Sequence, residues 1–458
     1  MDQRVRCLNT ATVRIPARYV LYWAQMNRRV DANFGLLYAV SLANALNLPV
    51  LFYEGLTFDY PYASDRFHTF ILEGVPATRR RLAAAGIGYL FYLRRRKSDP
   101  DDVLYRLAAD AAAVATDDYP TFVAAHHNAS VPAKIGVPYY AVDSSCIVPM
   151  SLLDKREYAA YTIRPKIRRL LPAWLQSPPP LKVRRRWTGP EPHIEASDGA
   201  SDIDHSVTPS ISFKGGPDAA YRALERFLCD RLRRYANERN EPAAHATSDL
   251  SPYLHFGHIS SLEIALAVKQ HAAEHKLLPD EFLEELIVRR ELAFNFARHT
   301  PRVDTLEALP DWARTTLRQH ARDRRPYLYR RDQFEKASTH DALWNATQRE
   351  LLWRGKIHGY YRMYWGKKII EWSATADDAL QTMIYLHDRY ALDGRDPNTY
   401  ANILWCFGLH DRPWPKRPVF GTVRYISLEG MKRKTDVDAY IHEVDGLART
   451  GKDPFRVK

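Results

Sequence analysis

A change of pattern near residue 176 constrains the fold of this 458-residue chain more than any other feature. Before it, short apolar runs alternate with helical stretches, which predicts a buried parallel sheet with helices on both faces. After residue 217, apolar residues recur only at helical spacing. The predicted strands are 19–23 (YVLYW), 49–53 (PVLFY), 88–93 (GYLFYL), 111–116 (AAAVAT) and 137–142 (VPYYAV).

The segment between the two patterns, 176–217, is rich in Pro, Gly and Ser and lacks apolar periodicity, which is typical of a linker. We therefore expect an α/β domain over residues 1–175, with a Rossmann-like sheet, and a larger all-α domain over 218–458. The predicted helical segments of the second domain are 218–240, 259–276, 279–298, 340–353, 357–372 and 376–390.

The composition excludes several classes of protein. No apolar run approaches the roughly 20 residues of a membrane span, and the first ten residues lack the apolar core of a signal peptide. The four cysteines lie far apart, which argues against a disulfide scaffold or a zinc site. We therefore expect a cytoplasmic protein without a metal site and without contact to a membrane.

The chain is basic and rich in large aromatic rings. Lys and Arg exceed Asp and Glu by 66 to 54, a net charge of +12, which permits a polyanionic partner without requiring one. Seven of the ten Trp residues fall between Trp312 and Trp414. No GxGxxG or GxxxxGK[ST] motif follows any predicted strand, so a standard dinucleotide site or P-loop is not supported.

Hydroxyl-bearing residues gather at 247–260, TSDLSPYLHFGHIS, just before Pro252. The simpler interpretation is a helix N-cap followed by a turn. The functional interpretation is that the hydroxyl and backbone N–H groups bind a phosphate at the start of a helix.

Arg362 shares one helix face with Trp365, Ile369 and Trp372. Aromatic residues at this spacing usually form a core, but a buried Arg needs a carboxylate partner. The turn-forming segment LDGRDPNTY at 392–400 supplies two candidate carboxylates. An Arg–Asp pair beside an aromatic face suits an anionic planar cofactor.

A second helical segment, 281–298, brings Glu285, Arg289 and Leu292 to one face at i, i+4 and i+7. A surface Glu–Arg pair there would stabilise the helix by about 0.3–0.5 kcal/mol. A functional Glu would instead lie in a cavity with a raised pKa. The spacing leaves both interpretations open.

Together, these motifs resemble the class II cyclobutane-pyrimidine-dimer photolyases over nearly the whole chain. In order, they are VLYWAQMNRRVDANFGLLYA, DKREYAAYTIRPKIRRLLP, TSDLSPYLHFGHIS, EELIVRREL, THDALWNATQRE, KIHGYYRMYWGKKIIEW, LDGRDPN, HDRPW, RPVFGTVRY and MKRKTDVDAYI. The resemblance implies a monomer with one FAD that repairs ultraviolet-damaged DNA under blue light, acting on a dimer flipped out of the duplex. It also allows a deazaflavin-type antenna in the first domain.

The resemblance also implies roles for individual residues. His387 stands where class II members have an Asn near the flavin N5, a difference that bears on flavin redox tuning. The other implied FAD contacts are Tyr235, Thr247, Ser248, Asp249, Leu250, Ser251, Arg289, Arg362, Asp393, Asp396 and Asn398.

The remaining roles belong to catalysis and to DNA. Glu285 resembles the active-site carboxyl, with Glu291 as a weaker candidate, and Met363 and Trp405 resemble the walls of the dimer pocket. The implied electron-transfer chain is Trp344, Trp365 and Trp372, and the implied DNA contacts are Arg239, Trp414 and Arg424. Lys432, Arg433 and Lys434 are either phosphate contacts or an ordinary solvated charge run.

Two alternatives remain open beside dimer repair. The first is a cryptochrome-like photoreceptor that binds FAD without repairing DNA, which His387 favours and Glu285, Met363 and Trp405 disfavour. The second is a nucleic-acid-binding module whose aromatic rings stack on bases. This second alternative leaves Arg362 and Asp393 unexplained.

Overall fold

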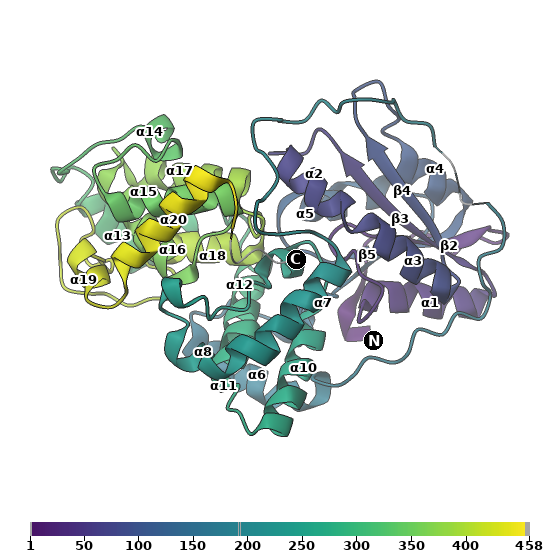
Figure 1. Ribbon diagram of the computed structural model, residues 1–458. Coiled ribbons are helices and arrows are strands. Elements are labelled where there is room, and N and C mark those ends of the chain that lie inside the picture. The colour runs from purple at the N-terminus through teal and green to yellow at the C-terminus, as the bar shows by residue number, and fades with distance from the viewer. Residues whose placement is uncertain (1, 191, 193, 454–458) are drawn as a thin grey trace.

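The computed structural model describes residues 2–190, 192 and 194–453 and consists of a sheet domain, a helical domain and an extended linker (Figure 1). The sheet domain holds the N-terminal third of the chain. Helices from the second half form the other domain, and the two pack side by side (Figure 1).

The sheet has six strands in the order β1-β6-β5-β2-β3-β4. Five of them are parallel, as predicted, and β1 pairs antiparallel with β6 at one edge. The sequence analysis missed β1 because it has only three residues and none is buried. The strands are β1 (Val5–Cys7), β2 (Tyr19–Trp23), β3 (Val50–Thr57), β4 (Gly88–Arg94), β5 (Ala111–Asp117) and β6 (Tyr139–Val142).

The strands are apolar throughout because both faces of the sheet are covered. Val20 and Tyr22 pack into the core beneath α1 and α3, whereas Leu21 and Trp23 pack into the core beneath α4. The helices of this domain are α1 (Phe34–Leu46), α2 (Asp65–Leu72), α3 (Val75–Ala85), α4 (Val103–Asp110) and α5 (Phe122–Ser130). The predicted fold class, a parallel α/β domain joined to an all-α domain, is confirmed.

The helical domain begins where the sequence pattern changes to helical spacing. Its helices are α7 (Pro217–Arg226), α8 (Leu232–Glu238), α9 (Ser251–His255), α10 (Ser261–His275), α11 (Asp280–Leu283), α12 (Arg290–Arg298), α13 (Asp311–Gln319), α14 (Arg331–Glu335), α15 (Ala342–Arg354), α16 (Gly359–Trp372), α17 (Ala376–Tyr390), α18 (Pro397–Trp405), α19 (Leu428–Lys432) and α20 (Val437–Thr450). Two π-helical turns, η4 (Phe227–Arg231) and η6 (Glu284–Arg289), interrupt the longer predicted helices.

Helix α6 (Ala160–Trp174) lies in the range predicted for the first domain but packs with the second. Ile163 and Ile167 are buried in one cluster with Leu286, and Arg164 pairs with Glu284 at 2.7 Å. The linker that follows runs around the outside of the sheet domain before it enters α7 (Figure 1). It has no helix or strand among the residues described between 175 and 216.

A buried arginine joins the two domains. Arg66 of α2 donates to the carbonyl oxygens of Leu351 (3.1 Å) and Leu352 (2.5 Å), in the last turn of α15. It also donates to the carbonyl of Tyr390 (2.7 Å), the last residue of α17. One side chain of the sheet domain therefore bonds carbonyl groups at the ends of two helices, where most carbonyls lack intrahelical partners; that of Leu351 also accepts from the Gly355 N–H at 3.0 Å.

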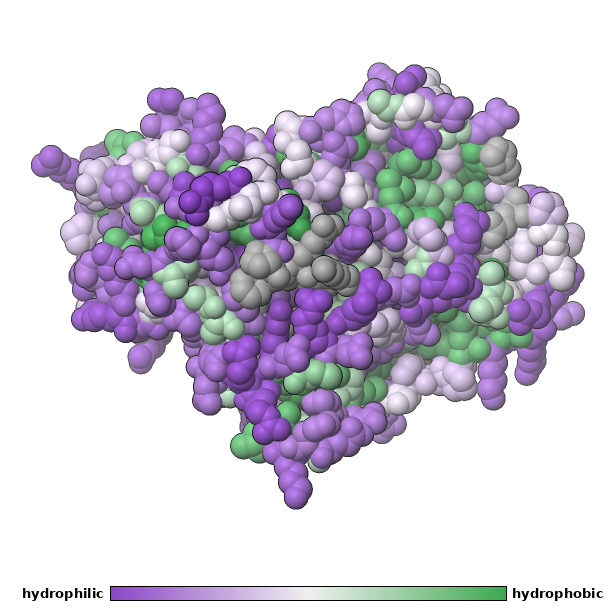
Figure 2. Space-filling model, viewed as in Figure 1, coloured by the Kyte–Doolittle hydropathy of each residue, from purple (hydrophilic) through white to green (hydrophobic). Residues whose placement is uncertain are grey.

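The surface of the molecule is mainly hydrophilic. Figure 2 shows that hydrophilic residues cover most of the visible face, while hydrophobic ones gather mainly over the sheet domain. Within the described part of the chain, none of the helices combines the length and the apolar character that a membrane span requires.

Candidate functional site

Two adjoining cavities open among the helices of the second domain. The outer cavity has a volume of about 580 Å³ and the inner cavity one of about 270 Å³. Five residues from four segments line both cavities and so mark their junction: Tyr235, Glu285, Gly359, Arg362 and Asn402.

The predicted Arg–Asp pair lies at the inner cavity. Arg362 of α16 contacts Asp393 at 3.1 Å, and Ser251 donates to the same carboxylate at 2.8 Å. Burial raises the pKa of Asp393, but the Arg362 charge, the other nearby charges and the Ser251 hydrogen bond together outweigh burial, and the pKa is lowered. Because Arg362 Nε is buried without a partner, this guanidinium retains a donor for a ligand.

The hydroxyl-rich segment 247–251 forms part of both cavity walls. Ser248, Leu250 and Ser251 line the inner cavity, and Thr247 lines the outer one. Asp249 instead points to cations, bonding Lys356 at 2.8 Å and Arg231 at 2.7 Å. These two charges outweigh burial and lower the pKa of Asp249. Asp249 therefore positions the Lys356 ammonium, which itself lines the inner cavity.

The loop that carries Asp393 also supplies Asp396 and Asn398 to the inner cavity. Asp396 caps α18 by accepting from the backbone N–H of Asn398 at 2.9 Å. Its other oxygen accepts from the Tyr119 hydroxyl at 2.5 Å and lies 3.4 Å from His255 Nδ1. Burial raises its pKa, but these partners outweigh burial and lower the pKa to about 2.

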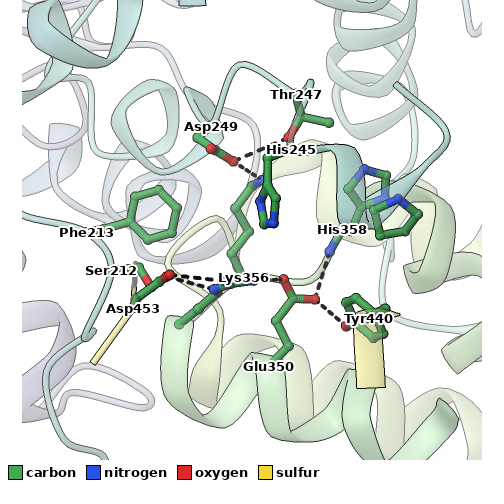
Figure 3. A pocket seen from close by; sticks show the side chains of 12 residues that line it. Ser212, Phe213, His245, Thr247, Asp249, Glu350, Lys356, His358, Tyr440 and Asp453 are labelled. Atoms are coloured by element: carbon green, nitrogen blue, oxygen red, sulfur yellow. Dashed lines mark hydrogen bonds and ion pairs between the residues drawn. The ribbon is translucent and has the colours of Figure 1, made fainter. Parts of the chain in front are cut away.

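A third cavity of about 40 Å³ adjoins both, sharing Lys356 with the inner and His358 with the outer cavity (Figure 3). Glu350 accepts from the hydroxyl of Tyr440 at 2.6 Å and from the backbone N–H of His358 at 3.3 Å. Arg354 contacts Glu350 at 3.1 Å and Asp453 at 2.8 Å. This polar cluster fixes the segment that carries Lys356 and His358.

Glu285 lies at the junction of the cavities, but its partner differs from the sequence expectation. Its carboxylate accepts from Arg239 at 2.8 Å and not from Arg289. The segment is not a regular α-helix: η6 is a π-helical turn with i→i+5 bonds, and Arg289 lies 3.8 Å from Glu284, the residue five positions before it. Of the two interpretations that the spacing left open, the Glu285–Arg289 surface pair is therefore not formed.

Arg289 lines neither the inner nor the outer cavity. Its guanidinium carbon lies 5.4 Å from the centre of the Trp405 ring, and its Nε is 3.8 Å from Glu284. The neighbouring Arg290, which the sequence analysis passed over, lines the inner cavity and donates to the Ser145 carbonyl at 2.6 Å.

The two predicted walls of a dimer pocket, Met363 and Trp405, both line the outer cavity. Glu291, the weaker carboxyl candidate, does not line either cavity and is 2% exposed. It accepts from the backbone N–H groups of Ile147 (2.6 Å) and Val148 (3.2 Å) in the sheet domain. Burial raises its pKa to about 8 despite these bonds.

The three predicted electron-transfer residues form one continuous set of rings. Trp365 and Trp344 are stacked with ring centres 6.4 Å apart, and Trp344 and Trp372 meet edge-on at 6.3 Å. Trp372 is only 2% exposed, and its ring contacts Tyr329 at 5.8 Å and His340 at 4.8 Å. The ring contacts therefore continue beyond Trp372 towards the surface.

Basic residues surround the outer cavity. It is lined by Arg239, Arg424, Arg433 and Lys434. Two of the three basic residues 432–434 therefore belong to the cavity wall. Arg424 also lies over the ring of Trp414, 5.0 Å from its centre. The predicted DNA contacts thus share one side of the molecule.

His387, in the last turn of α17, is fully buried. Neither ring nitrogen has a hydrogen-bond partner among the described residues. Burial, aided by the Arg362 charge, lowers its pKa to about 3. The imidazole is therefore neutral at physiological pH.

Three polar residues that line the inner cavity escaped the sequence analysis: Lys356, Arg290 and Asn402. Lys356 and Arg290 lie in the motifs KIHGYYRMYWGKKIIEW and EELIVRREL, which were already singled out, but nothing local marked them. Asn402 follows Asn398 by one turn of α18, and this i, i+4 spacing was the one signal that could have identified it.

A further cavity of about 330 Å³ lies at the carboxyl ends of β2 and β3. Its aromatic lining includes Trp23, Phe67 and Phe122, and Arg28 and Asp59 add charge. It lies where the strand order reverses between β2 and β5, the usual place for a ligand in an open α/β sheet.

Comparison with known proteins agrees with this architecture. Residues 20–183 match the DNA photolyase family. A deoxyribodipyrimidine photo-lyase from Methanothermobacter thermautotrophicus is 40% identical over 97% of this chain and 98% of its own. The chain belongs to the DNA photolyase family. Within this family, a deoxyribodipyrimidine photo-lyase from Oryza sativa is 39% identical over 95% of this chain and 89% of its own.

Solved structures of a cryptochrome and of photolyases share the fold. A cryptochrome from Synechocystis aligns with a TM-score of 0.71 at 16% identity, over 94% of this chain and 90% of its own. A Sulfolobus tokodaii photolyase with two FAD molecules aligns with a TM-score of 0.62 at 17% identity, over 95% of both chains. At these identities the likeness concerns the fold alone.

Proposed function

We propose that this protein is a class II photolyase that repairs cyclobutane pyrimidine dimers in DNA with light and FAD. The observation that carries the proposal is the junction of the two cavities. There, the partly buried Arg362–Asp393 pair lies beside a basic, aromatic-walled opening that also contains Glu285. The relatives named deoxyribodipyrimidine photo-lyase support the same activity.

The inner cavity suits FAD. Lys356, the Ser248–Ser251 segment and the unpartnered Arg362 Nε offer donors to an anionic ligand, while Leu254, Phe282 and Leu286 offer apolar surface to its rings. Bound by these residues, reduced FAD would supply the light-driven electron-transfer chemistry for splitting the dimer. The Arg362 cation favours negative charge in the cavity.

The outer cavity suits a flipped-out dimer. Met363 and Trp405 provide apolar walls, and Glu285 lies within reach of both cavities. A protonated carboxyl can donate to a carbonyl oxygen that gains charge. Arg239 and Arg424 are placed to bind phosphate or to fill the space the dimer leaves in the duplex.

The cavity at the carboxyl ends of β2 and β3 suits a planar antenna of deazaflavin type, because aromatic side chains line it and Arg28 and Asp59 give it charge. Extracting the chromophores of the purified protein and identifying them by mass tests this part of the proposal. A second chromophore beside FAD is the expected result.

The repair proposal is tested with the purified protein, reduced under blue light and mixed with a thymine-dimer oligonucleotide. We expect light-dependent recovery of the ultraviolet absorbance of the pyrimidines, and none in a dark control. Bound, fully reduced FAD without any recovery would favour a cryptochrome-like photoreceptor instead. Absence of flavin would overturn both.

A further inference from the structure

An exposed pair of tyrosines lies at the start of α6, and neither lines the inner or the outer cavity. Tyr161 is 65% exposed and Tyr158 is 43% exposed, and their ring centres are 6.3 Å apart. Exposed aromatic rings offer a large apolar area that a partner can cover. Arg164 follows Tyr161 by one turn of α6 and so shares its face.

Two sets of contacts connect this pair to the outer cavity. In the first set, the Tyr158 hydroxyl donates to the carbonyl of Asp411 at 2.9 Å, and the Asp411 carboxylate accepts from Trp414 Nε1 at 3.2 Å. The guanidinium of Arg424, which lines the outer cavity, lies 5.0 Å from the centre of the Trp414 ring. Tyr158 therefore holds the loop that carries Trp414 against α6.

The second set of contacts runs through η6. Arg164 pairs with Glu284 at 2.7 Å, and Glu284 also lies 3.8 Å from Arg289 Nε. The Arg289 guanidinium lies over the ring of Trp405, which is a wall of the outer cavity. Two arginines thus share one carboxylate, which leaves an excess positive charge between α6 and the cavity.

The exposed Arg412 adds a further guanidinium, 5.5 Å from the centre of the Trp414 ring. We define the α6 surface by five residues: Tyr158, Tyr161, Arg164, Arg289 and Arg412. Cations that contact phosphates and aromatic rings that stack on bases are the combination with which proteins bind a single nucleic-acid strand. The α6 surface joins both features beside the cavity proposed for the dimer.

We propose that the α6 surface binds the damaged DNA strand on one side of the flipped-out dimer, with the Tyr161 ring stacked on a base. This inference rests on the function proposed above. Because the surface lies to one side of the outer cavity, only one of the two flanks of the dimer, 5′ or 3′, can reach it. The two flanks therefore contribute differently to binding.

Two single-stranded oligonucleotides test this proposal, one extending the dimer on the 5′ side alone and the other on the 3′ side alone. In the FAD-loaded protein, Tyr161→Ala should weaken binding of one of them by at least about fivefold, as for the loss of one stacked base. Binding of the other, and the repair yield of bound dimers, should not change. Tyr161→Phe keeps the ring and should bind both oligonucleotides like wild type. Arg412→Gln should reduce the salt dependence of binding for the oligonucleotide that Tyr161→Ala affects.

The matched control is Tyr327→Ala, which removes a tyrosine that is 47% exposed in the segment before α14, away from α6 (Figure 1). It should leave both affinities unchanged. Equal effects of Tyr161→Ala on the two oligonucleotides, or no effect on either, would overturn the role of the α6 surface alone. A loss in Tyr161→Phe as large as in Tyr161→Ala would also overturn the stacking. A wild-type protein that binds neither oligonucleotide would overturn the proposed function as well.

Discussion

At the junction of the two cavities, Glu285 has a partner within the protein before any substrate binds. Arg239 contacts Glu285 at 2.8 Å and Glu281 at 3.1 Å, so one guanidinium holds two carboxylates. Glu281 lines neither cavity, whereas Glu285 lines both. Substituting Glu281 and Glu285 separately therefore distinguishes a role in the reaction from a general effect of removing a negative charge.

Replacing Glu285 with Gln should slow dimer splitting more than it weakens DNA binding, because the proposed role lies in the step where charge develops. We expect repair per absorbed photon to fall roughly tenfold, equivalent to about 1.4 kcal/mol. Flash-induced absorbance recovery and a binding titration measure the two quantities. Glu281→Gln should leave the repair yield unchanged, and equal losses of repair and binding in Glu285→Gln would contradict the role.

Glu291 predicts a dependence of stability on pH. Its folded-state pKa of about 8 lies above the roughly 4.3 of an unfolded chain, so folding favours the protonated form. This contribution is fully present below about pH 4 and is lost as the pH rises towards 8. In Glu291→Gln, the decrease in the urea-unfolding free energy between about pH 5 and pH 8 should therefore be smaller by a few kcal/mol.

The exposed Glu429→Gln is the control for this measurement and should keep the wild-type pH profile. An identical profile in wild type and Glu291→Gln would mean that Glu291 is ionised in the folded protein throughout this range.

At the scale of elements, the π-helical turn η6 decides which side chains meet. It carries Glu284, Glu285 and Arg289, and it separates α11 from α12. Across this turn, Glu285 contacts Arg239 at the end of α8. Arg289 lies over the Trp405 ring and 3.8 Å from Glu284, five positions earlier, which is the separation that a π-helical turn bonds.

Helices α15 and α16 carry the tryptophan chain, which predicts a separation of photoreduction from repair. Trp365→Phe should slow light-driven reduction of bound flavin by more than about tenfold. Repair by chemically reduced protein should persist, because that step does not require the chain. Transient absorption measures the first rate and the dimer assay the second.

Trp353 provides the matched control. It lies on α15 with Trp344, but among the described residues its ring does not contact the three tryptophans of the electron-transfer chain. Trp353→Phe should leave photoreduction unchanged. Equal photoreduction in Trp365→Phe and wild type would exclude this route.

At the scale of the whole molecule, Arg66 links the sheet domain to the helix ends beneath the cavities. It is 1% exposed, and burial lowers its pKa to about 10 without neutralising it. Arg66→Met would leave the carbonyls of Leu351, Leu352 and Tyr390 without this donor. We expect a loss of about 1–3 kcal/mol in unfolding free energy for each buried carbonyl left unsatisfied, with faster amide exchange at the ends of α15 and α17.

Arg80→Met is the comparison, because Arg80 is exposed and pairs with the surface residue Asp218. Its effect should stay below about 1 kcal/mol. A similarly small effect for Arg66→Met would show that other contacts suffice to join the domains.

Much of this architecture was predictable because the spacing of apolar residues indicates which faces of a helix or strand are buried. The five apolar runs became β2 to β6, and the segments 340–353, 357–372 and 376–390 became α15, α16 and α17 with small shifts at their ends. The short strand β1 carried no such pattern. The motifs also identified most lining residues of the inner cavity, including Ser251, Arg362 and Asp393.

The sequence by itself thus determined the elements, the fold class and the chemistry of the motif residues. Only the tertiary structure decided their partners: Tyr119 with Asp396, Arg66 with the ends of α15 and α17, and Arg239 with Glu285. These contacts join residues up to 324 positions apart. Local spacing specifies which side of an element faces inward, but it does not specify which distant segment covers that side.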